Sequence, residues 1–375
     1  MTSRVVQIVC PAGVVSGKEV ASLTLAGGLR NSGFDPRFMI SVWSNGEFPR
    51  QLDAKGFARE SLPFGFISLS LRPDLARMTF GQLQRWPELV RKFRRLVAAT
   101  KPQAVIHANW HHALLLLPLL DPRRDIYWAH EFAPATGRYA VLFRALAARV
   151  KRIVCVSHAV ERNLLSLGVA RDKLAVVHNG IEPVCGKGEP PAKAPLRLGI
   201  VGQVTDWKGH EDLFAALCLL AKNDVACELS VFGGGMAANL ERMKAKASEM
   251  GIGNIVRWRG FVPERADIYR QIDVCVAPSR DPEPFGMSAL EANAFGRPVV
   301  CTASGGLGEI VEDGRTGIVV APRQPHLLAE AIARLARDPG LCAAMGEAGR
   351  RRAQGEFAEK QFAEQFGQII ANGQA

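Results

Sequence analysis

Short apolar runs alternate with longer amphipathic stretches along the first half of the chain. Apolar runs of strand length occur at residues 4–10, 36–42, 103–107, 125–129, 152–156 and 174–177. Runs this short, bounded by polar and turn-forming residues, predict buried strands, and the stretches between them are typical of helices. Strands that alternate with helices predict parallel βαβ units in a doubly wound sheet, whose ligands bind at the carboxyl ends of the strands.

The same alternation starts again after a change in composition. Residues 182–196 are rich in Pro, Gly and Lys, which is typical of a linker. Beyond them the pattern predicts strands at 196–201, 227–232, 255–258, 273–277 and 298–301, and helices at 325–337, 340–353 and 357–371. We therefore expect an α/β protein with an N-terminal Rossmann-like domain at 1–183, a linker at 184–196, a C-terminal Rossmann-like domain at 197–355 and a last helix at 356–375.

One stretch of the second half, residues 278–300, combines a loop, a helix and two carboxylates. Three of its first seven residues are proline, which favours a loop, and apolar residues recur at helical spacing after Gly286. Glu283 lies in the loop and Glu291 in the helix, where side chains lean toward the helix N-terminus. Both can face one ligand beside free amides that favour an anion, so the pattern indicates a phosphate joined to a polyol, such as a nucleotide sugar. Spacing alone equally allows a Pro-rich connection with a solvated glutamate.

This stretch resembles a known family. The segments Glu283-Pro-Phe-Gly, Leu290-Glu291-Ala and Gly296-Arg-Pro-Val-Val resemble the Glu-x7-Glu signature of the retaining glycosyltransferases of family 4. The resemblance is strong over residues 196–320 and weaker in the first half. It implies the GT-B fold, in which two Rossmann-like doubly wound domains face a cleft and the last helix crosses back to the first domain.

The resemblance also implies how a nucleotide-sugar donor would be bound. Glu291 would bind the ribose hydroxyls, and Glu283, as a catalytic residue, would bind hydroxyls of the transferred sugar. Backbone amides of Phe285, Gly286 and Met287 would bind the sugar and the diphosphate.

Further donor-binding residues are implied in three other loops. Lys208 matches the family's lysine that grips the diphosphate and is the second catalytic residue. The family usually has arginine where this chain has Gln203, a departure for which Arg280, Arg138 or Lys18 would compensate. The turn with Phe261 and Val262 would hold the nucleotide base through backbone groups, and the loop at Gly17 would face the diphosphate and the acceptor.

Several histidines of the first half follow predicted strands. His130 lies at the carboxyl end of the strand at 125–129, and the family has an equivalent catalytic histidine that contacts the donor sugar. A surface or capping histidine is the other interpretation. His107, His111 and His112 cluster after another strand; the spacing of His107 and His111 allows a metal pair, but no further ligand follows, so we favour an acceptor-side loop. We place Arg138 on the acceptor side as well.

Composition restricts where the protein acts. None of the eight cysteines forms a Cys-x-x-Cys pair, which favours reduced thiols in a cytosol over disulfides or zinc. The apolar run at the N-terminus is too short for a signal peptide, and the longest Leu-rich run is too short to span a membrane. We expect a cytoplasmic protein.

The net charge of +11 lies entirely in the first half of the chain. Residues 1–184 carry 25 lysines and arginines against 13 acidic residues, whereas residues 185–375 carry 22 against 23. Residues 72–101 hold eight of these cations, and Leu83, Trp86, Val90, Phe93 and Val97 recur there at helical spacing. A helix that is cationic on one face and apolar on the other suits an anionic membrane surface, although an ordinary domain helix with a solvated basic face gives the same pattern.

The leading hypothesis is a retaining hexosyltransferase that uses a nucleotide-diphosphate sugar. Its acceptor would be a glycan or a lipid-linked glycan of a cell-surface polysaccharide or lipopolysaccharide, at the cytoplasmic membrane face. We expect no cofactor and no metal, because the resemblance explains Glu283 without the metal motif that Asp281-Pro-Glu283 suggests. In this family the donor phosphate is thought to take the acceptor proton. The alternatives are a nucleotide-sugar 2-epimerase of the same fold and a basic protein that binds glycan or nucleic acid.

Overall fold

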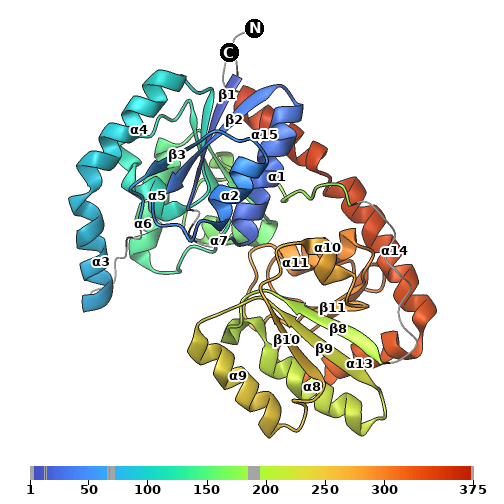
Figure 1. Cartoon of the computed structure of the whole chain (residues 1–375). Helices are drawn as coiled ribbons and strands as arrows, with labels where there is room; N and C mark the ends of the chain where they lie inside the picture. Colours follow the sequence, from blue (N-terminus) through green and yellow to red (C-terminus); the bar gives the residue numbers. More distant parts are fainter. Residues whose placement is uncertain are drawn as a thin grey trace. The chain divides into compact units, whose positions relative to one another are not determined.

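The computed structural model describes residues 4–11, 13, 15–65, 67, 72–184 and 195–372. It divides into two compact units (Figure 1): the first comprises Met1–Gly180 with Glu359–Ala375, and the second Ile181–Ala358. Most of the linker predicted at 184–196 lies outside the described residues.

The first unit contains a parallel sheet in which seven strands are described, in the order β3-β2-β1-β4-β5-β6-β7. The strands are β1 (Arg4–Cys10), β2 (Phe34–Ser41), β3 (Arg59–Leu62), β4 (Ala104–His107), β5 (Asp125–Ala129), β6 (Arg152–Cys155) and β7 (Leu174–Val176). All neighbours are parallel. β4 and β5 are buried along their whole length, as strands covered by helices on both faces must be.

Helices flank this sheet (Figure 1). They are α1 (Gly17–Asn31), α2 (Glu47–Ala54), α3 (Pro73–Gln84), α4 (Trp86–Thr100), α5 (Trp110–Leu115), α6 (Gly137–Arg149), α7 (His158–Ser166) and α15 (Glu359–Ala371), with short turns η1 (Leu117–Leu119) and η2 (Arg171–Lys173). The last helix, α15, packs against α1 at Gly28, where an added Cβ would lie 2.6 Å from the Cβ of Ala363. Glycine therefore permits the close approach that attaches the chain's end to the first unit.

The second unit contains a parallel sheet with six described strands, in the order β10-β9-β8-β11-β12-β13. The strands are β8 (Leu196–Val201), β9 (Cys227–Phe232), β10 (Val256–Gly260), β11 (Val274–Ala277), β12 (Val299–Thr302) and β13 (Gly317–Val320). The helical segments are η3 (Asp206–Lys208), α8 (His210–Lys222), α9 (Ala237–Glu249), α10 (Arg265–Tyr269), α11 (Met287–Ala294), α12 (Leu307–Ile310), α13 (Pro325–Arg337) and α14 (Pro339–Glu356).

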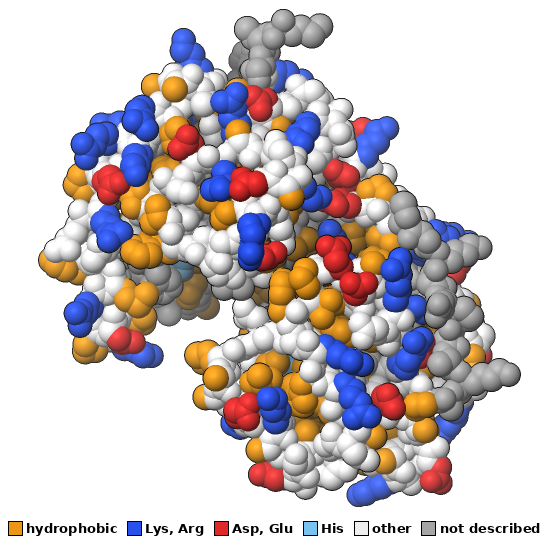
Figure 2. Space-filling model, in the orientation of Figure 1, with side chains coloured by type: hydrophobic (Ala, Val, Ile, Leu, Met, Phe, Trp, Pro, Cys, Tyr) orange, Lys and Arg blue, Asp and Glu red, His pale blue; other side chains and the backbone are white. Residues whose placement is uncertain are grey.

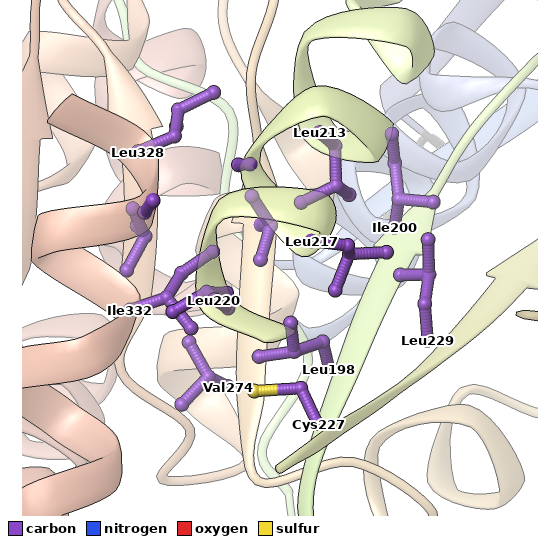
Figure 3. Close-up of a cluster of buried hydrophobic side chains, with 14 of the residues drawn as sticks. Leu198, Ile200, Leu213, Leu217, Leu220, Cys227, Leu229, Val274, Leu328 and Ile332 are labelled. Atoms are coloured by element: carbon purple, nitrogen blue, oxygen red, sulfur yellow. The ribbon is translucent and has the colours of Figure 1, made fainter. Parts of the chain in front are cut away.

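One hydrophobic cluster fixes the second sheet against its helices (Figure 3). Leu198 and Ile200 of β8 lie against Leu213 and Leu217 of α8, and α13 adds Ile332 from the other side. All five side chains are buried. This packing holds β8 and α8 rigidly, and so positions the loop between them.

The two parallel sheets and their flanking helices confirm the predicted fold class, with three local differences. Strands β3 and β13 were not predicted, because each is short and lies at a sheet edge with few buried side chains. The basic segment at 72–101 is two helices, α3 and α4, separated at Arg85. Pro87 lies in the first turn of α4, where its missing N–H costs nothing. Throughout the described ranges, no helix is long and apolar enough to cross a bilayer.

Candidate active site

The strand order of the second unit reverses between β8 and β11, which are neighbours in the sheet. Ligands of open parallel sheets bind at such a point, just beyond the carboxyl ends of the strands. The loop after β8 carries Gln203 and Lys208, and the loop after β11 carries Ser279 and Glu283. The topology therefore brings two predicted site loops together.

Gly209 lets these two loops touch. Its φ of +75° lies in the left-handed region, and an added Cβ would lie 1.9 Å from the carbonyl oxygen of Pro278. A larger residue would both strain the backbone and push the loops apart. The backbone N–H of Arg280 also donates to the Trp207 carbonyl across the same junction, at 2.7 Å.

Lys208 and Glu283 form an ion pair at this junction. The ammonium Nζ lies 2.5 Å from Glu283 Oε1, and the Ser279 hydroxyl donates to Glu283 Oε2 at 2.8 Å. The two side chains of the pair are only 14% and 10% exposed. Lys208 also lies over the ring of Trp207, 4.4 Å from its centroid. A cation and a carboxylate are thus held close together at the position where a ligand is expected.

A backbone strap supports Glu283 from the other side. The N–H of Gly306 donates to the Glu283 carbonyl at 2.7 Å, and Gly305 adopts a φ of +64° beside it. A Cβ on Gly305 would lie 2.1 Å from the Glu283 carbonyl oxygen, so only glycine fits. Residues 304–306 therefore fix the backbone from which the carboxylate projects.

Helix α11 begins four residues after Glu283. Gly286 is its N-cap, with a φ of +113°, and its carbonyl accepts from the Ala289 and Leu290 N–H groups. The two amides before these, of Met287 and Ser288, are too early in the helix to have a partner within it. Phe285 is buried and Met287 is half-buried. The positive end of the helix therefore lies next to the Lys208–Glu283 pair along the chain, an arrangement that favours an anion.

Glu291 lies on α11 and is 8% exposed. Its Oε2 accepts a hydrogen bond from the Tyr269 hydroxyl at 2.9 Å, and its Oε1 lies 3.9 Å from Arg265 Nη1. Burial raises the pKa of Glu291, while the Arg265 charge and the Tyr269 hydrogen bond oppose that rise.

The charges of Glu291, Lys208 and Glu283 all affect the pKa of one buried thiol, that of Cys275 on β11. Burial raises its pKa to about 12, and charges on Glu291, Lys208 and Glu283 all act on it. All three predicted site residues therefore lie within electrostatic reach of one point near the end of β11.

The remaining predicted donor residues lie in nearby loops. Gln203 is exposed after β8, Phe261 is 56% exposed after β10, and Val262 is half-buried. Arg280, which we expected to compensate for Gln203, is held by acidic neighbours: it donates to both oxygens of Asp212 at 2.8 and 2.6 Å and to Glu211 at 3.3 Å.

Asp281 does not join Glu283 in a shared site. Its carboxylate is exposed and pairs with Arg323 at 2.9 Å, whereas the Glu283 carboxylate faces Lys208 and Ser279. In the part of the chain that the structure describes, no group of three or more His, Cys, Asp or Glu residues is placed to hold a metal ion.

The first unit has its own reversal of strand order, between β1 and β4. Gly17 begins α1 just beyond β1, and the next residue, Lys18, pairs with Glu131 at 2.5 Å. Burial alone would lower the pKa of Lys18, but the Glu131 and Glu19 carboxylates outweigh it and raise that pKa. The start of α1 and the loop after β5 therefore meet through a charge pair, as the segments after β8 and β11 do.

His130 lies at the carboxyl end of β5, beside the Trp128 ring. Its Nε2 atom is buried with no hydrogen-bond partner in the described structure. Burial, helped by the nearby Lys18 charge, holds its pKa well below the ordinary value, so the imidazole is neutral at pH 7. His130 as a residue is only half-buried, unlike His107 and His112, and its neutral ring could bond a sugar hydroxyl through Nε2 once the atoms that cover this nitrogen move.

The other predicted histidines divide into two groups. His111 is half-buried and stacked on Trp110, with its pKa lowered by burial to about 4. His107 is fully buried and bonded to Asp125 at 2.7 Å, and His112 is buried against Phe64. Burial leaves His107 and His112 no surface through which to touch an acceptor, which corrects our placement of both in an acceptor-side loop. Arg138 is exposed at the start of α6.

Sequence reasoning missed three neighbours of the candidate site residues. Ser279 and Tyr269 bond the two glutamates, and Arg265 lies near Glu291. Serine after a buried strand and tyrosine in an amphipathic helix are common, so no motif identified them. Only the folded structure shows that these three residues lie close to the glutamates.

Two family profiles match the two halves of the chain. The profile described as "Glycosyltransferase Family 4" matches residues 15–184, and the one described as "Glycosyl transferases group 1" matches residues 187–352. The chain is a GT4-type glycosyltransferase. A relative from Streptomyces avermitilis, named D-inositol 3-phosphate glycosyltransferase, is 33% identical over 83% of this chain and 71% of its own length.

Solved structures of low sequence identity share the GT-B fold of this glycosyltransferase. HepE of Anabaena, solved in complex with UDP and glucose, aligns with a TM-score of 0.80 at 19% identity over 98% of this chain and 99% of its own. A sucrose-phosphate synthase from Thermosynechococcus elongatus aligns with a TM-score of 0.80 at 21% identity over 98% of both chains. The predicted family and fold are therefore confirmed.

Proposed function

We propose that this glycosyltransferase transfers a hexose from a nucleotide-diphosphate sugar with retention of configuration. The observation that carries the proposal is the Lys208–Glu283 pair beside the first turn of α11, at the reversal point of the second sheet. Lys208 and the helix amides supply positive charge for a diphosphate, and Glu283 supplies an acceptor for sugar hydroxyls. Glu291 then binds the ribose, and HepE in complex with UDP and glucose shows the same fold with such ligands bound.

In this proposal the catalytic roles fall to Lys208, Glu283 and His130. The Lys208 ammonium moves away from Glu283 and stabilises the negative charge that develops on the leaving diphosphate. Glu283 then binds the sugar. His130, whose imidazole is neutral and half-buried, contacts the transferred sugar. The donor phosphate takes the acceptor proton, so no side chain is assigned as the base.

Metal independence belongs to the same proposal. The Lys208 ammonium and the amides of α11 replace the cation that other transferases place on the diphosphate. Asp281 pairs with Arg323 instead of facing the ligand side of Glu283, which supports this assignment.

A donor assay tests the proposal. The enzyme is incubated with labelled UDP-, GDP- and ADP-hexoses, with and without inositol phosphate, glycan or lipid-linked acceptors, and the anomeric configuration of the product is read by NMR. We expect acceptor-dependent release of nucleoside diphosphate, retained configuration and full activity in excess EDTA. Glu283→Gln should abolish transfer, whereas Glu330→Gln, an exposed change on α13, should not.

Other outcomes of this assay contradict specific parts of the proposal. An isomerised donor in the absence of acceptor would identify the 2-epimerase instead. Activity that EDTA removes and Mg²⁺ or Mn²⁺ restores would overturn metal independence. Wild-type turnover by Glu283→Gln would overturn the site.

We also propose that the enzyme attaches to the cytoplasmic membrane face and takes a glycan or lipid-linked acceptor there. Three exposed apolar side chains on α3 support this: Met78, Phe80 and Leu83 are 55%, 63% and 53% exposed. Trp43 adds a fourth, 55% exposed, with Arg85 4.7 Å above its ring. Figure 2 shows Lys and Arg side chains among apolar ones over α3 and α4.

Only part of the basic segment at 72–101 can form this surface. Leu89 and Phe93 of α4 are buried in the first unit, so the apolar face of α4 is part of the core. Helix α3 instead presents its apolar side chains beside Arg77 and between the exposed arginines at its two ends, Arg72 and Arg85, of which Arg72 pairs with Asp74. Each cation near an anionic leaflet contributes about 1 kcal/mol, so a few of them suffice for reversible attachment.

Liposome flotation tests the membrane proposal. Binding should require anionic lipid, fall with added salt and be largely lost in the variant Phe80→Ser/Leu83→Ser. Val141→Ser on α6 and Met236→Ser before α9 change equally exposed apolar residues elsewhere and should bind as wild type. Equal flotation with neutral and anionic vesicles, or with neither, would overturn the proposal.

A further inference from the structure

Tyr269 is a buried residue that bonds a glutamate of the candidate site. Its side chain is fully buried at the end of α10, and its ring stacks on Phe295 with centroids 5.2 Å apart. Arg297 Nε donates to the Tyr269 carbonyl at 2.8 Å. The backbone and the ring of Tyr269 are therefore each held by a neighbour, and the hydroxyl lies 2.9 Å from Glu291 Oε2.

The Tyr269 hydroxyl has one proton and two nearby acceptors. The Ser288 carbonyl lies at 3.1 Å and the Glu291 carboxylate at 2.9 Å. A charged acceptor binds a proton donor more strongly than a neutral carbonyl does, so the proton points to Glu291. Burial and the neighbouring Glu291 charge raise the pKa of Tyr269 well above its ordinary value, so the phenol remains a donor.

This bond fixes how Glu291 presents its oxygens. Glu291 Oε1 lies 3.9 Å from Arg265 Nη1, which is too long for a hydrogen bond, and Arg265 lies equally far from Glu182. One carboxylate oxygen is thus held by Tyr269, while the other keeps its lone pairs for a ligand. Two neighbouring hydroxyl groups, as on ribose, need a carboxylate of fixed orientation to bind both at once.

We propose that Tyr269 is a positioning residue that sets the recognition of the nucleotide ribose through Glu291. This inference rests on the proposed function, because it takes Glu291 as the ribose ligand. Tyr269 itself touches no substrate. Without its hydroxyl the Glu291 side chain gains rotational freedom, so the ribose bonds lose their geometry although Glu291 is still present.

Calorimetric titration of the full chain tests the proposal with two ligands. The probe is whichever of UDP, GDP and ADP binds most tightly, compared with its own 2′-deoxy analogue. Wild type should prefer the ribonucleotide about tenfold, the factor of one charge-assisted hydrogen bond. Tyr269→Phe keeps the stacked ring and should lower this preference to about twofold.

Two controls separate positioning from a general loss of structure. Tyr127→Phe removes the hydroxyl of a buried tyrosine in the first unit and should keep the wild-type preference. Both ligands also see the same folded fraction of Tyr269→Phe, so partial unfolding would weaken both equally and leave the ratio unchanged.

A pH profile gives a second readout. Ribose binding needs an ionised Glu291, and the charged and titratable groups that act on Glu291 are Arg265, Tyr269 and Cys275. Loss of a donor to the ionised form raises a carboxyl pKa, so the acid limb of binding should move to higher pH in Tyr269→Phe. Glu291→Gln should lack this limb, and the ligand's own phosphate ionisation is common to all variants.

The outcomes are distinct. A wild-type ribose preference and acid limb in Tyr269→Phe would overturn the positioning role and leave the proposed function intact. If wild type itself has no ribose preference, or binds none of the nucleotides, both the role of Tyr269 and the assignment of Glu291 fail.

Discussion

Replacing Lys208 by methionine should destabilise the second unit. The change keeps the length of the side chain but removes the ammonium group that lies 2.5 Å from Glu283. The carboxylate is then left with one hydrogen bond, from Ser279, in a place where its side chain is only 10% exposed. Breaking a buried pair on one side costs about 3–5 kcal/mol, and residual solvent access puts this pair near the lower end, at about 3 kcal/mol.

The double variant Lys208→Met/Glu283→Gln should recover most of that loss. An uncharged amide can still accept the Ser279 hydroxyl bond and leaves no stranded charge. Glu283→Gln alone should cost less, about 1 kcal/mol, since Lys208 keeps its contact with the Trp207 ring. The three variants and wild type form a cycle that isolates the energy of the pair.

Urea unfolding followed by tryptophan fluorescence and circular dichroism measures the cycle. All three variants should lack transferase activity, so stability and turnover report independently. A Lys208→Met enzyme that unfolds at the wild-type urea concentration would refute the reasoning. So would a double variant less stable than Lys208→Met, because it would show that the stranded charge is not the source of the loss.

Two further predictions concern His111 of the first unit and the junction at Gly209. Acidification from pH 6.5 to 4 should destabilise the first unit. Folded His111 has a pKa of about 4, so the unfolded chain binds its proton first. In urea unfolding at stepped pH, His111→Gln should reduce this loss without removing it, because burial also holds the pKa values of His112 and His130 below the ordinary value. An undiminished loss in His111→Gln would place its source elsewhere. In the same urea assay, Gly209→Ala should lower the free energy of unfolding by well over 1 kcal/mol, because it adds a clash with Pro278 to the left-handed strain. Gly251→Ala, at φ +73° in open space, should lower it by only about 1 kcal/mol. Equal losses in the two variants would contradict the contact with Pro278.

Much of the fold follows from apolar runs alone. β1, β4 and β5 are buried along nearly their whole length, so their residues are apolar in sequence and easy to recognise. β3 buries only Leu62, so it has no such run and is a strand because β2 pairs with it. β3 is therefore a strand because of its tertiary pairing, which a local sequence pattern does not predict.

The candidate site was predictable to a different extent in each of its parts. Glu283 and Glu291 belong to one ordered motif, Lys208 matches the family in another loop, and the resemblance proposed all three. Their partners depend on contacts between segments distant in sequence: Tyr269 meets Glu291 across 22 residues, and Lys208 meets Glu283 across 75. A single sequence carries no signal for such contacts. The placement of His107 failed for a related reason, because burial beside Asp125 depends on the neighbouring strand β5.

The basic segment shows where a periodic pattern stops being informative. An apolar stripe at helical spacing tells that one face of a helix avoids water, but it does not tell what covers that face. In α4 the answer is the first unit itself, since Phe93 is buried there. In α3 the described residues leave Phe80 and Met78 uncovered, and the surrounding cations would repel a second copy of the same surface. An anionic lipid surface covers both kinds of side chain at once, and this makes α3 the part of the segment on which the membrane proposal depends.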